Sequence, residues 1–196
     1  MFTTTIDTLR LELRPFQSDD LDQFWKIGPS NYEIACWLTG LTWPPLFEEA
    51  KEFIDSARAA NQNTDSYPFA IDCNGQLIGC IEVQKAGDLK EFPELPTIGY
   101  WLSSAAQGHG YMQEACVAAL HWGFARDACN IFAVRVFANN FPSQRTLKRL
   151  GFEPVGVCIR YSKPLKQNVE NIIMHLPRDR FEALHGDAHV MMGAAQ

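Results

Sequence analysis

The most informative stretch of this chain is Gln107-Gly108-His109-Gly110-Tyr111-Met112. It follows the apolar segment Ile98–Leu102, which predicts a strand, and it opens a segment from Tyr111 to about Asp127 that predicts a long helix. A strand, a glycine-rich turn and a helix N-terminus can bind phosphate, because glycines let the backbone approach and the first helical N–H groups lack intrahelical acceptors. The helix dipole adds about 0.3–1 kcal/mol per charge when exposed and roughly 2 when partly buried.

The turn alone leaves two alternatives open. It could bind a phosphate, or it could simply close a tight corner between a strand and a helix. A dinucleotide fingerprint is poorly matched, because its third glycine position holds Gln113 and the next predicted strand, Ile131–Phe137, has no acidic residue at its end. A nucleotide triphosphate loop is not matched either, since no Gly-Lys-Ser/Thr sequence follows the glycines.

The next segment predicts a strand followed by a short helix. Ile131–Phe137 is rich in β-branched and aromatic residues and is bounded by asparagines. Asn140 then predicts a helix cap, Pro142 suits the first turn, and Gly151 ends the helix. Three basic side chains lie on one side of this helix: Arg145, Lys148 and Arg149.

Taken together, these segments resemble the GCN5-related N-acetyltransferase (GNAT) family, and within it the RimJ/RimL-type ribosomal-protein N-terminal acetyltransferases. The resemblance covers roughly Leu9 to Leu176. Any one motif is weak, but the ordered set is specific. The segments that carry it are Ile98–Leu102, Gln107–Met112, Ala115–Phe124, Asn140–Ser143 and Leu147–Phe152.

The resemblance implies acetyl-coenzyme A as the acetyl donor and an amine as the acceptor. It also implies that the two strands flanking the long helix splay apart and that the pantetheine arm lies in the gap. Family members usually carry Gly or Ala where Met112 stands, so Met112 is expected either to lend only its backbone or to pack in the core. The expected cofactor-binding residues are Tyr100, Trp101, Leu102, Gln107, Gly108, His109, Gly110, Tyr111, Met112, Asn140, Ser143, Arg145 and Lys148.

Two catalytic residues are proposed from the same resemblance. Ser143 matches the serine of the family's Asn-x-x-Ser and becomes the expected proton donor to the leaving thiolate; the alternative is that Asn140 is only a cap and Ser143 a first-turn residue. Many relatives carry Glu just before the Ile-Gly-Tyr of the central strand, but this chain has Thr97. Glu82, on the neighbouring predicted strand, is therefore the candidate base, with a solvated strand residue as its alternative.

Other candidate residues follow from the same reasoning. Trp37 and Trp43 are expected to line the acceptor pocket, because the segment between the first two helices faces that cleft in the family. The basic residues after Ser143 either meet the ribose phosphate or form an exposed helix end favoured by the dipole. The histidines form no ligand pattern, so no metal is expected.

Composition narrows the class of protein further. The 196 residues suit one domain, and a net charge of −6 argues against general nucleic-acid binding. The six cysteines form no Cys-x-x-Cys and mostly lie in apolar runs, so they are expected to be reduced core residues. No stretch approaches a membrane span and residues 1–7 do not resemble a signal peptide, so we expect a cytoplasmic protein. The sequence leaves open whether it is a monomer or a homodimer.

The whole pattern predicts a mixed α/β domain over residues 1–177, followed by a tail, 178–196, with one weak helical turn and a partly disordered end. The sheet should hold about seven strands, mostly antiparallel, with helices on both faces and one parallel pair joined by the long helix. The expected strands are Thr8–Arg14, Tyr67–Cys73, Gln76–Gln84, Ile98–Leu102, Ile131–Phe137, Phe152–Arg160 and Val169–Leu176. The expected helices begin at Ser18 or Asp19 and run through Lys26, and cover Ser30–Leu38, Phe47–Asn61, Tyr111–Asp127 and the short helix after Asn140.

The leading functional hypothesis is an N-acetyltransferase that moves an acetyl group to a primary amine, either a protein N-terminus or a small molecule, through a ternary complex. The alternative is a non-catalytic acyl-coenzyme A sensor, which Thr97 motivates. A dinucleotide oxidoreductase is poorly supported by the fingerprint.

Overall fold

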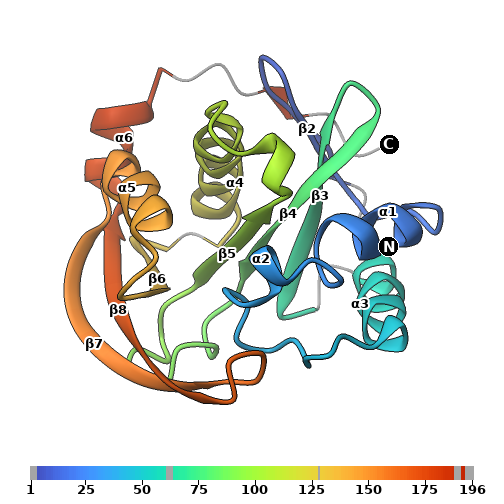
Figure 1. The fold of residues 1–196 in the computed structure, drawn as a ribbon. Helices are drawn as coiled ribbons and strands as arrows, with labels where there is room; N and C mark the ends of the chain where they lie inside the picture. Colours follow the sequence, from blue (N-terminus) through green and yellow to red (C-terminus); the bar gives the residue numbers. More distant parts are fainter. Residues whose placement is uncertain (1–3, 61–63, 128, 188–190, 193–196) are drawn as a thin grey trace.

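The computed structural model describes residues 4–60, 64–127, 129–187 and 191–192 of the chain. Within them one sheet has nine strands in the order β7-β8-β6-β5-β4-β3-β2-β1-β9 (Figure 1). The strands are β1 (Ile6–Asp7), β2 (Glu12–Arg14), β3 (Ser66–Cys73), β4 (Gln76–Gln84), β5 (Thr97–Leu102), β6 (Ile131–Phe137), β7 (Glu153–Ser162), β8 (Gln167–Pro177) and β9 (Met191–Met192). The helices are α1 (Asp20–Ile27), α2 (Tyr32–Ala35), α3 (Phe47–Ala59), α4 (Tyr111–Asp127), α5 (Phe141–Leu150) and α6 (Arg178–His185), with a 3-10 turn η1 (Ser104–Ala106).

The central strands β5 and β6 form the one parallel pair among the described strands, and they touch at a single point. Thr97 on β5 is the partner of Ala133 on β6, and the Ala133 N–H donates to the Pro96 carbonyl at 2.9 Å. By contrast, β4 and β5 stay paired along the whole length of β5, from Gln84–Thr97 to Gly79–Leu102. The two parallel strands therefore diverge from Thr97 onward, which confirms the expected splay.

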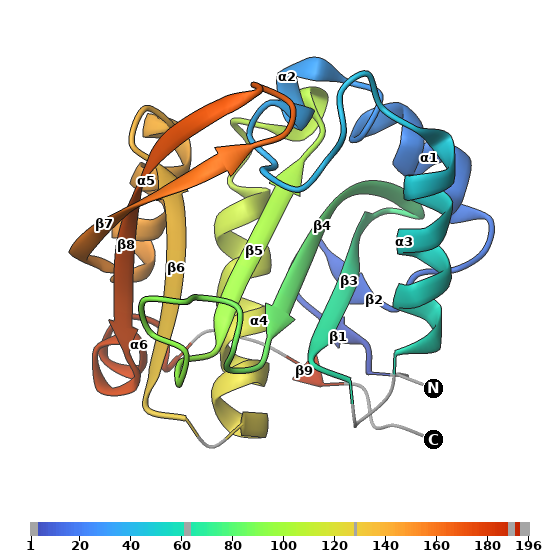
Figure 2. The same ribbon diagram turned by 90° about the horizontal axis from the view of Figure 1, so that it is seen from below.

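Helices cover both faces of the sheet, as expected (Figure 2). On one face α4 packs with α5 and α6 over the larger core, to which Leu120, Leu147 and Phe181 contribute buried side chains. On the other face α1 and α3 cover a second core built around Phe24 and Ile54. This burial is the main source of stability, at about 25 cal/mol per Å² of apolar surface.

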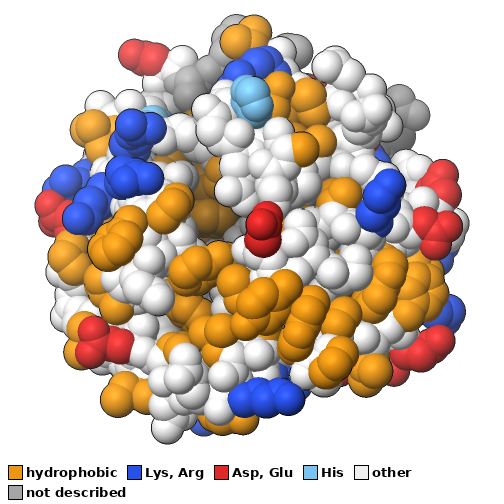
Figure 3. Space-filling model, viewed as in Figure 1, with side chains coloured by type: hydrophobic (Ala, Val, Ile, Leu, Met, Phe, Trp, Pro, Cys, Tyr) orange, Lys and Arg blue, Asp and Glu red, His pale blue; other side chains and the backbone are white. Residues whose placement is uncertain are grey.

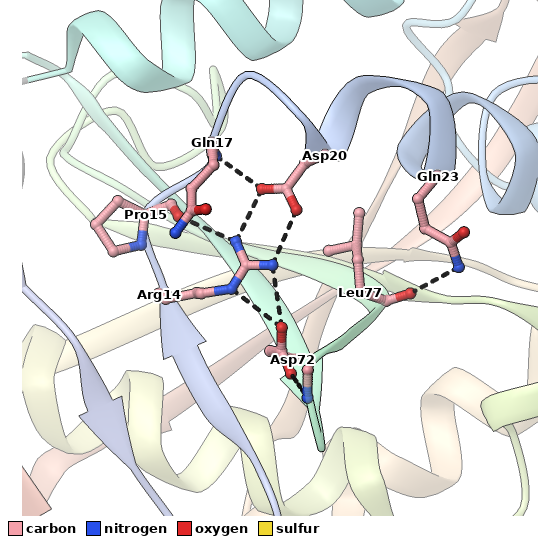
Figure 4. Close-up of polar contacts among 8 residues, drawn as sticks. Arg14, Pro15, Gln17, Asp20, Gln23, Asp72 and Leu77 are labelled. Carbon is pink, nitrogen blue, oxygen red and sulfur yellow. Dashed lines mark hydrogen bonds and ion pairs between the residues drawn. The ribbon is translucent and has the colours of Figure 1, made fainter.

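A buried ion-pair cluster ties the start of the chain to the sheet. The Arg14 guanidinium contacts Asp20 at 2.8 Å and Asp72 at 3.0 Å, so it joins β2 to α1 and β3 (Figure 4). Asp72 also accepts from the Gly75 N–H at 2.7 Å in the hairpin turn. The two carboxylates raise the pKa of Arg14 above its ordinary value, although burial works against this. The cluster therefore holds the first residue of α1, Asp20, against strands β2 and β3.

Local signals set several element boundaries. Asn74 and Gly75 have φ of +54° and +79°, as a two-residue hairpin turn between β3 and β4 requires. The Asn140 side chain accepts from the Ser143 N–H at 3.2 Å and begins α5. Gly151 ends α5 in the left-handed region at φ +100°. The sequence predicted both ends of this helix for those reasons.

Some expected elements differ from the structure. The expected first strand, Thr8–Arg14, is only Glu12–Arg14, because the Thr8 N–H donates to the Leu11 carbonyl at 2.9 Å and turns the chain. The expected helix Ser30–Leu38 is only Tyr32–Ala35: Asn31 is its N-cap, and the Trp37 and Leu38 N–H groups donate to carbonyls three residues back. The additional strands β1 and β9 bring the described strands to nine.

The segment after Pro177 holds more than one helical turn. Helix α6 runs from Arg178 to His185 and its Phe181 is buried. Met191–Met192 pairs with Ile6–Asp7. The expected disorder of the tail concerns residues 188–190 and 193–196, which lie outside the described residues.

Candidate active site

A cavity of about 690 Å³ opens where β5 and β6 diverge. Its lining comes from both strands, from the turn before α4, from the start of α5 and from α2. Residues on opposite faces of β5 take part, because consecutive side chains of a strand point to opposite faces and both Gly99 and Tyr100 line the cavity. The cavity therefore crosses the sheet through the gap between the two strands. Figure 3 shows the hollow, with basic side chains gathered to one side of it over α5.

The glycine-rich turn forms one end of this cavity. Gly108 and Gly110 have φ of +82° and +81°, a conformation that other residues rarely adopt. An added Cβ at Gly108 would meet no atom within 4 Å, so the backbone here faces open space. The first N–H groups of α4 have no intrahelical acceptor. This end of the cavity can therefore bind an anion with backbone N–H groups.

Arg10 holds the glycine-rich turn in place. Its guanidinium donates to the His109 carbonyl at 3.0 Å and contacts the Glu114 carboxylate at 2.7 Å. Burial raises the pKa of Glu114, but hydrogen bonds from Thr8 and Arg10 outweigh this and lower it below its ordinary value. The carboxylate is thus held charged beside the arginine. Sequence reasoning missed Arg10, because nothing in a turn near the N-terminus indicates a contact a hundred residues away.

The edge of β5 that faces the gap carries three of the predicted cofactor-binding residues. Tyr100, Trp101 and Leu102 all line the cavity, and the Leu102 carbonyl accepts from the Gln107 side chain at 3.2 Å. The indole of Trp101, however, packs in the second core, 5.4 Å from the Phe24 ring and against Gly28. Trp101 can therefore serve this cavity through its backbone, while its side chain is structural.

The start of α5 brings two hydroxyl groups together. Ser143 Oγ lies 2.9 Å from Tyr100 Oη, across the gap between the splayed strands. Burial raises the pKa of the Tyr100 phenol well above its ordinary value, so this hydroxyl stays protonated at neutral pH. Asn140 lines the cavity and also caps the helix. The pair can donate a proton into the cavity, and Tyr100 was predicted only as a cofactor contact.

Glu82 lines the cavity on the other face of the sheet. It is the direct cross-strand partner of Gly99, so both lie on the same face. An added Cβ at Gly99 would meet nothing within 4 Å, which leaves open space beside the Glu82 side chain. The Ser66 hydroxyl donates to the Glu82 carboxylate. Glu82 is thus a half-buried carboxylate with room for a small group next to it.

A polar network around Thr97 closes the narrow end of the gap between β5 and β6. The Thr97 hydroxyl lies 3.2 Å from Asp88 and 3.2 Å from Gln84. Asp88 is paired with Arg135 of β6 at 2.8 Å. The network bridges the two diverging strands at their contact point. Asp88 and Arg135 were missed, because the loop Lys85–Pro96 gives no signal of its own beyond its polarity.

Acidic and aromatic side chains stand at the α2 end of the cavity. Glu33 lines it and accepts from the Ser104 hydroxyl at 3.1 Å, which links α2 to η1. Trp37 also lines it, 5.8 Å from the ring of Phe137. Trp43 does not line the cavity, because its ring packs at 4.7 Å against Tyr32, which is outside the lining. Its predicted acceptor contact is therefore not part of this cavity.

Of the remaining predicted cofactor-binding residues, most line the cavity and two, His109 and Lys148, do not. His109 lies outside the lining, since its ring sits 5.7 Å from Tyr111 and its carbonyl is turned toward Arg10. Lys148 also lies outside, on the exposed side of α5. Arg149, which was considered with Arg145 and Lys148 for the ribose phosphate, is in the lining. Besides Tyr100, Trp101 and Leu102, the predicted cofactor-binding residues that line the cavity are Gln107, Gly108, Gly110, Tyr111, Met112, Asn140, Ser143 and Arg145.

Neither a metal site nor a membrane-spanning helix is found among the described residues. Within the described ranges, no cluster of three or more His, Cys, Asp or Glu side chains could hold a metal ion. None of the described helices is both long and apolar enough to cross a membrane.

The family model, the curated relative and the solved structures that resemble this chain are all acetyltransferases. Residues 10–153 match the acetyltransferase (GNAT) domain family. The ribosomal-protein-serine acetyltransferase of Escherichia coli (strain K12) is 24% identical over 152 residues, which cover 74% of this chain and 83% of that protein. Mycobacterium smegmatis RimJ in complex with CoA-disulfide superposes with a TM-score of 0.75 at 21% identity, covering 89% of this chain and 88% of the other. The ribosomal-protein α-N-acetyltransferase RimL in complex with coenzyme A superposes with a TM-score of 0.73 at 18% identity, covering 88% and 97%.

Proposed function

Because this chain belongs to the GNAT acetyltransferase family, we propose that it transfers the acetyl group of acetyl-coenzyme A to a primary amine within a ternary complex. The observation that supports this most is the cavity through the sheet, which has separate chemistry on its two sides. The backbone N–H groups at the start of α4 and the side chains of Arg145 and Arg149 lie on one side of the cavity. The carboxylates of Glu82 and Glu33 lie on the other side. A donor and an acceptor can therefore enter from opposite faces and meet between β5 and β6.

The residues on the α4–α5 side fit coenzyme A. The turn at Gly108 and Gly110 leaves backbone free to approach a pyrophosphate, and the start of α4 adds a favourable dipole. Arg145 and Arg149 line the cavity and suit the ribose phosphate. The unpaired edge of β5 beyond Thr97 can hydrogen-bond the amides of the pantetheine arm. When bound, acetyl-coenzyme A supplies the thioester that carries the acetyl group.

On the acceptor side, Glu82 is the group we assign as base. An attacking amine must lose a proton as its nitrogen forms the new bond to the acetyl carbon. The open space beside Gly99 allows the amine to stand next to the Glu82 carboxylate, which accepts that proton directly or through one water. Thr97 cannot do this, because its hydroxyl is not basic at neutral pH and is engaged with Asp88 and Gln84.

Ser143 and Tyr100 are the pair we assign to the leaving group. As the carbon–sulfur bond breaks, the electron pair goes to sulfur, which then takes a proton. Ser143 can donate that proton and recover one from the Tyr100 phenol, 2.9 Å away. Burial raises the pKa of the Tyr100 phenol, so this hydroxyl is protonated at neutral pH and can act as a hydrogen-bond donor to Ser143. The proton held by Glu82 then goes to solvent and Tyr100 takes one back from solvent, so that all three side chains return to their starting protonation states.

The acceptor we favour is the amino terminus of a protein. The acceptor end is framed by exposed Trp37 and Glu33, which suit an apolar side chain and a cationic amine of an extended chain end. The names of the E. coli and RimL relatives point to ribosomal proteins as the acceptors of those enzymes. Cys80, Cys116 and Cys158 are buried and form no disulfide, which suits a reducing compartment, and we place the reaction in the cytoplasm.

Turnover across an acceptor panel tests this proposal. Free thiol release from acetyl-coenzyme A is followed with amino-terminal peptides of ribosomal proteins, polyamines and aminoglycosides, and acetylated products are identified by mass spectrometry. We expect product with peptides and little with the other classes. Tight coenzyme binding without turnover on any amine would instead favour the non-catalytic acyl-coenzyme A sensor.

A further inference from the structure

A second hollow lies beside the narrow end of the cavity. Its volume is about 350 Å³, and it is lined by residues 65–66 and 84–88, where β3 begins and β4 ends (Figure 2). Gln84 and Asp88 line the cavity as well, so the two spaces share a wall. Asp65, Ala86 and Gly87 are exposed, and an added Cβ at Gly87 would meet nothing within 4 Å. The hollow is therefore open to solvent along a way that does not pass through the cavity.

Glu82 stands between the two spaces. Its side chain lines the cavity, and its carboxylate accepts a hydrogen bond from the hydroxyl of Ser66, which lines the hollow. Ser66 is the cross-strand partner of Gln84, and Glu82 lies two residues before Gln84 on β4, so the three side chains share one face of the sheet. A hydroxyl thus connects the candidate base directly to a space outside the cavity.

The proposed reaction requires the acceptor to lose two protons. An α-amine has a pKa of about 8, so most acceptor molecules arrive as ammonium ions at about pH 7. One proton must leave before the nitrogen can attack, and a second must leave as the new carbon–nitrogen bond forms. Glu82 can hold only one of them at a time. It must therefore release the first proton while the donor and the acceptor still occupy the cavity.

We propose that Ser66 passes protons from Glu82 into the second hollow, so that Glu82 can act twice in one turnover. This inference rests on the proposed role of Glu82 as the base, and it adds the path by which the proton leaves. Protonated Glu82 donates its proton to the Ser66 oxygen, while the Ser66 hydroxyl passes its own hydrogen to a water in the hollow. The hydroxyl then turns and donates again to the Glu82 carboxylate. One O–H bond forms for each one that breaks, and the water carries the charge to solvent.

The charged groups around this path balance each other. In the wall shared with the cavity, Asp88 is paired with Arg135 of β6 at 2.8 Å. Asp65 and Lys85 line the hollow, where the Lys85 N–H donates to the Asp65 carbonyl at 2.8 Å. On β4, burial and then the charge of the base raise the pKa of the Cys80 thiol, so it stays protonated. The path therefore runs over the Ser66 hydroxyl between two walls that each hold both signs of charge.

Two variants of the same shape test whether the Ser66 hydroxyl passes the proton. Ser66→Thr keeps a hydroxyl, and Ser66→Val puts a methyl group in its place; both are β-branched and suit a strand. With an amino-terminal peptide as acceptor at about pH 6.5, we expect the kcat of Ser66→Val to lie about tenfold or more below that of Ser66→Thr. At about pH 9, where most amines arrive deprotonated, the two kcat values should agree within about twofold.

A third variant separates a proton path from simple positioning of Glu82. Ala86→Trp leaves Ser66 and Glu82 unchanged and puts a large side chain into the hollow. It should also lower kcat at about pH 6.5 and recover at about pH 9, because the water in the hollow is displaced. Ala59→Trp is the matched control, since it places the same side chain on the exposed end of α3, and its kcat should equal that of the wild type.

Three results would overturn this inference. Equal kcat for Ser66→Thr and Ser66→Val at low pH would mean that no hydroxyl is needed. A loss in Ser66→Val without a loss in Ala86→Trp would mean that Ser66 only holds Glu82 in place. A loss of the same size at low and high pH would mean that the variants damage the site. In each case the wild-type turnover stands, whereas a wild-type protein that acetylates no amine would refute the proposed function and this path with it.

Discussion

Tyr100 and Ser143 lie 43 residues apart in the chain, yet their hydroxyl oxygens are 2.9 Å apart across the gap between the splayed strands. The contact exists because β5 and β6 part beyond Thr97 and α5 begins beside the opening. It places two protonated hydroxyls in the wall of a cavity that joins both faces of the sheet.

Removing the Ser143 hydroxyl should lower kcat and leave acetyl-coenzyme A affinity nearly unchanged, because the proton is needed mainly in the transition state. A loss of about 100- to 10,000-fold in kcat is the expected range for a positioned acid in Ser143→Ala. Tyr100→Phe should lower kcat too, but less, since it acts through Ser143. Steady-state kinetics and calorimetry on the same preparations separate the two parameters. An alanine variant with wild-type kcat would exclude Ser143 as the acid.

Replacing Glu82 by Gln should slow turnover most at low pH, where fewer amine molecules arrive deprotonated. Raising the pH should restore part of the rate, because the acceptor then needs less help from a base. The pH–rate profile of kcat/KM is the measurement. If the profiles of Glu82→Gln and wild type coincide, the proton leaves the amine by another route.

Gly99 offers a test of the acceptor side that does not strain the backbone. Its φ lies outside the left-handed region and an added Cβ would meet nothing within 4 Å, so Gly99→Val should fold. The valine should fill the space beside Glu82 and raise the KM for the amine by about tenfold or more, the cost of displacing a well-placed group. Calorimetry should show little change in coenzyme affinity. Unchanged acceptor KM would mean that the amine approaches elsewhere.

Arg10 should matter for coenzyme binding although it lies outside the cavity lining. Its contacts to His109 and Glu114 hold the glycine-rich turn, so Arg10→Ala should weaken acetyl-coenzyme A binding by about tenfold through loss of charge-assisted hydrogen bonds. The kcat at saturating coenzyme should change little. Arg58→Ala, which removes an exposed arginine of α3, is the control. Equal affinities for both variants would remove Arg10 from this role.

The Arg14 cluster should dominate local stability at the first strands. Arg14→Met leaves Asp20 and Asp72 buried without their partner, and removal of one member of a buried ion pair costs about 3–5 kcal/mol. Lys51→Met removes an exposed pair with Asp55 and should cost less than about 1 kcal/mol. Urea unfolding of both variants measures the difference. Similar losses in the free energy of unfolding for Arg14→Met and Lys51→Met would show that the buried cluster contributes no more to stability than an exposed ion pair.

Much of the fold could be predicted from the sequence, because its strongest patterns are local. The bounds of β4, α4 and β6 agree with those expected from periodicity and turn residues. The turn between β1 and β2 is held by a contact that spans the chain, from the Thr8 hydroxyl to Glu114 at 2.7 Å, and periodicity carries no information about such a contact. The start of α2 is set locally by the cap Asn31, one residue after the expected start.

In the candidate site too, residues marked by local motifs could be predicted and residues that depend on distant contacts could not. Gly108, Gly110, Asn140 and Ser143 were predicted because motifs with fixed spacing mark them, and the structure brings them to one cavity. Arg10, Asp88 and Arg135 could not be predicted, since each acts through a partner that is distant in sequence. Trp43 was assigned to the acceptor pocket from the family pattern, and its packing against Tyr32 puts it outside the cavity.

The most direct test of the account is titration calorimetry with acetyl-coenzyme A on the wild-type protein and on Gly108→Val. The backbone of Gly108 faces open space in the cavity at φ +82°, and a valine there would push the turn away from the pyrophosphate. We predict saturable binding at one site per chain in the wild type, and binding weakened by about tenfold or more in the folded variant. No heat of binding at hundreds of micromolar acetyl-coenzyme A, or equal affinity for the two proteins, would contradict the account.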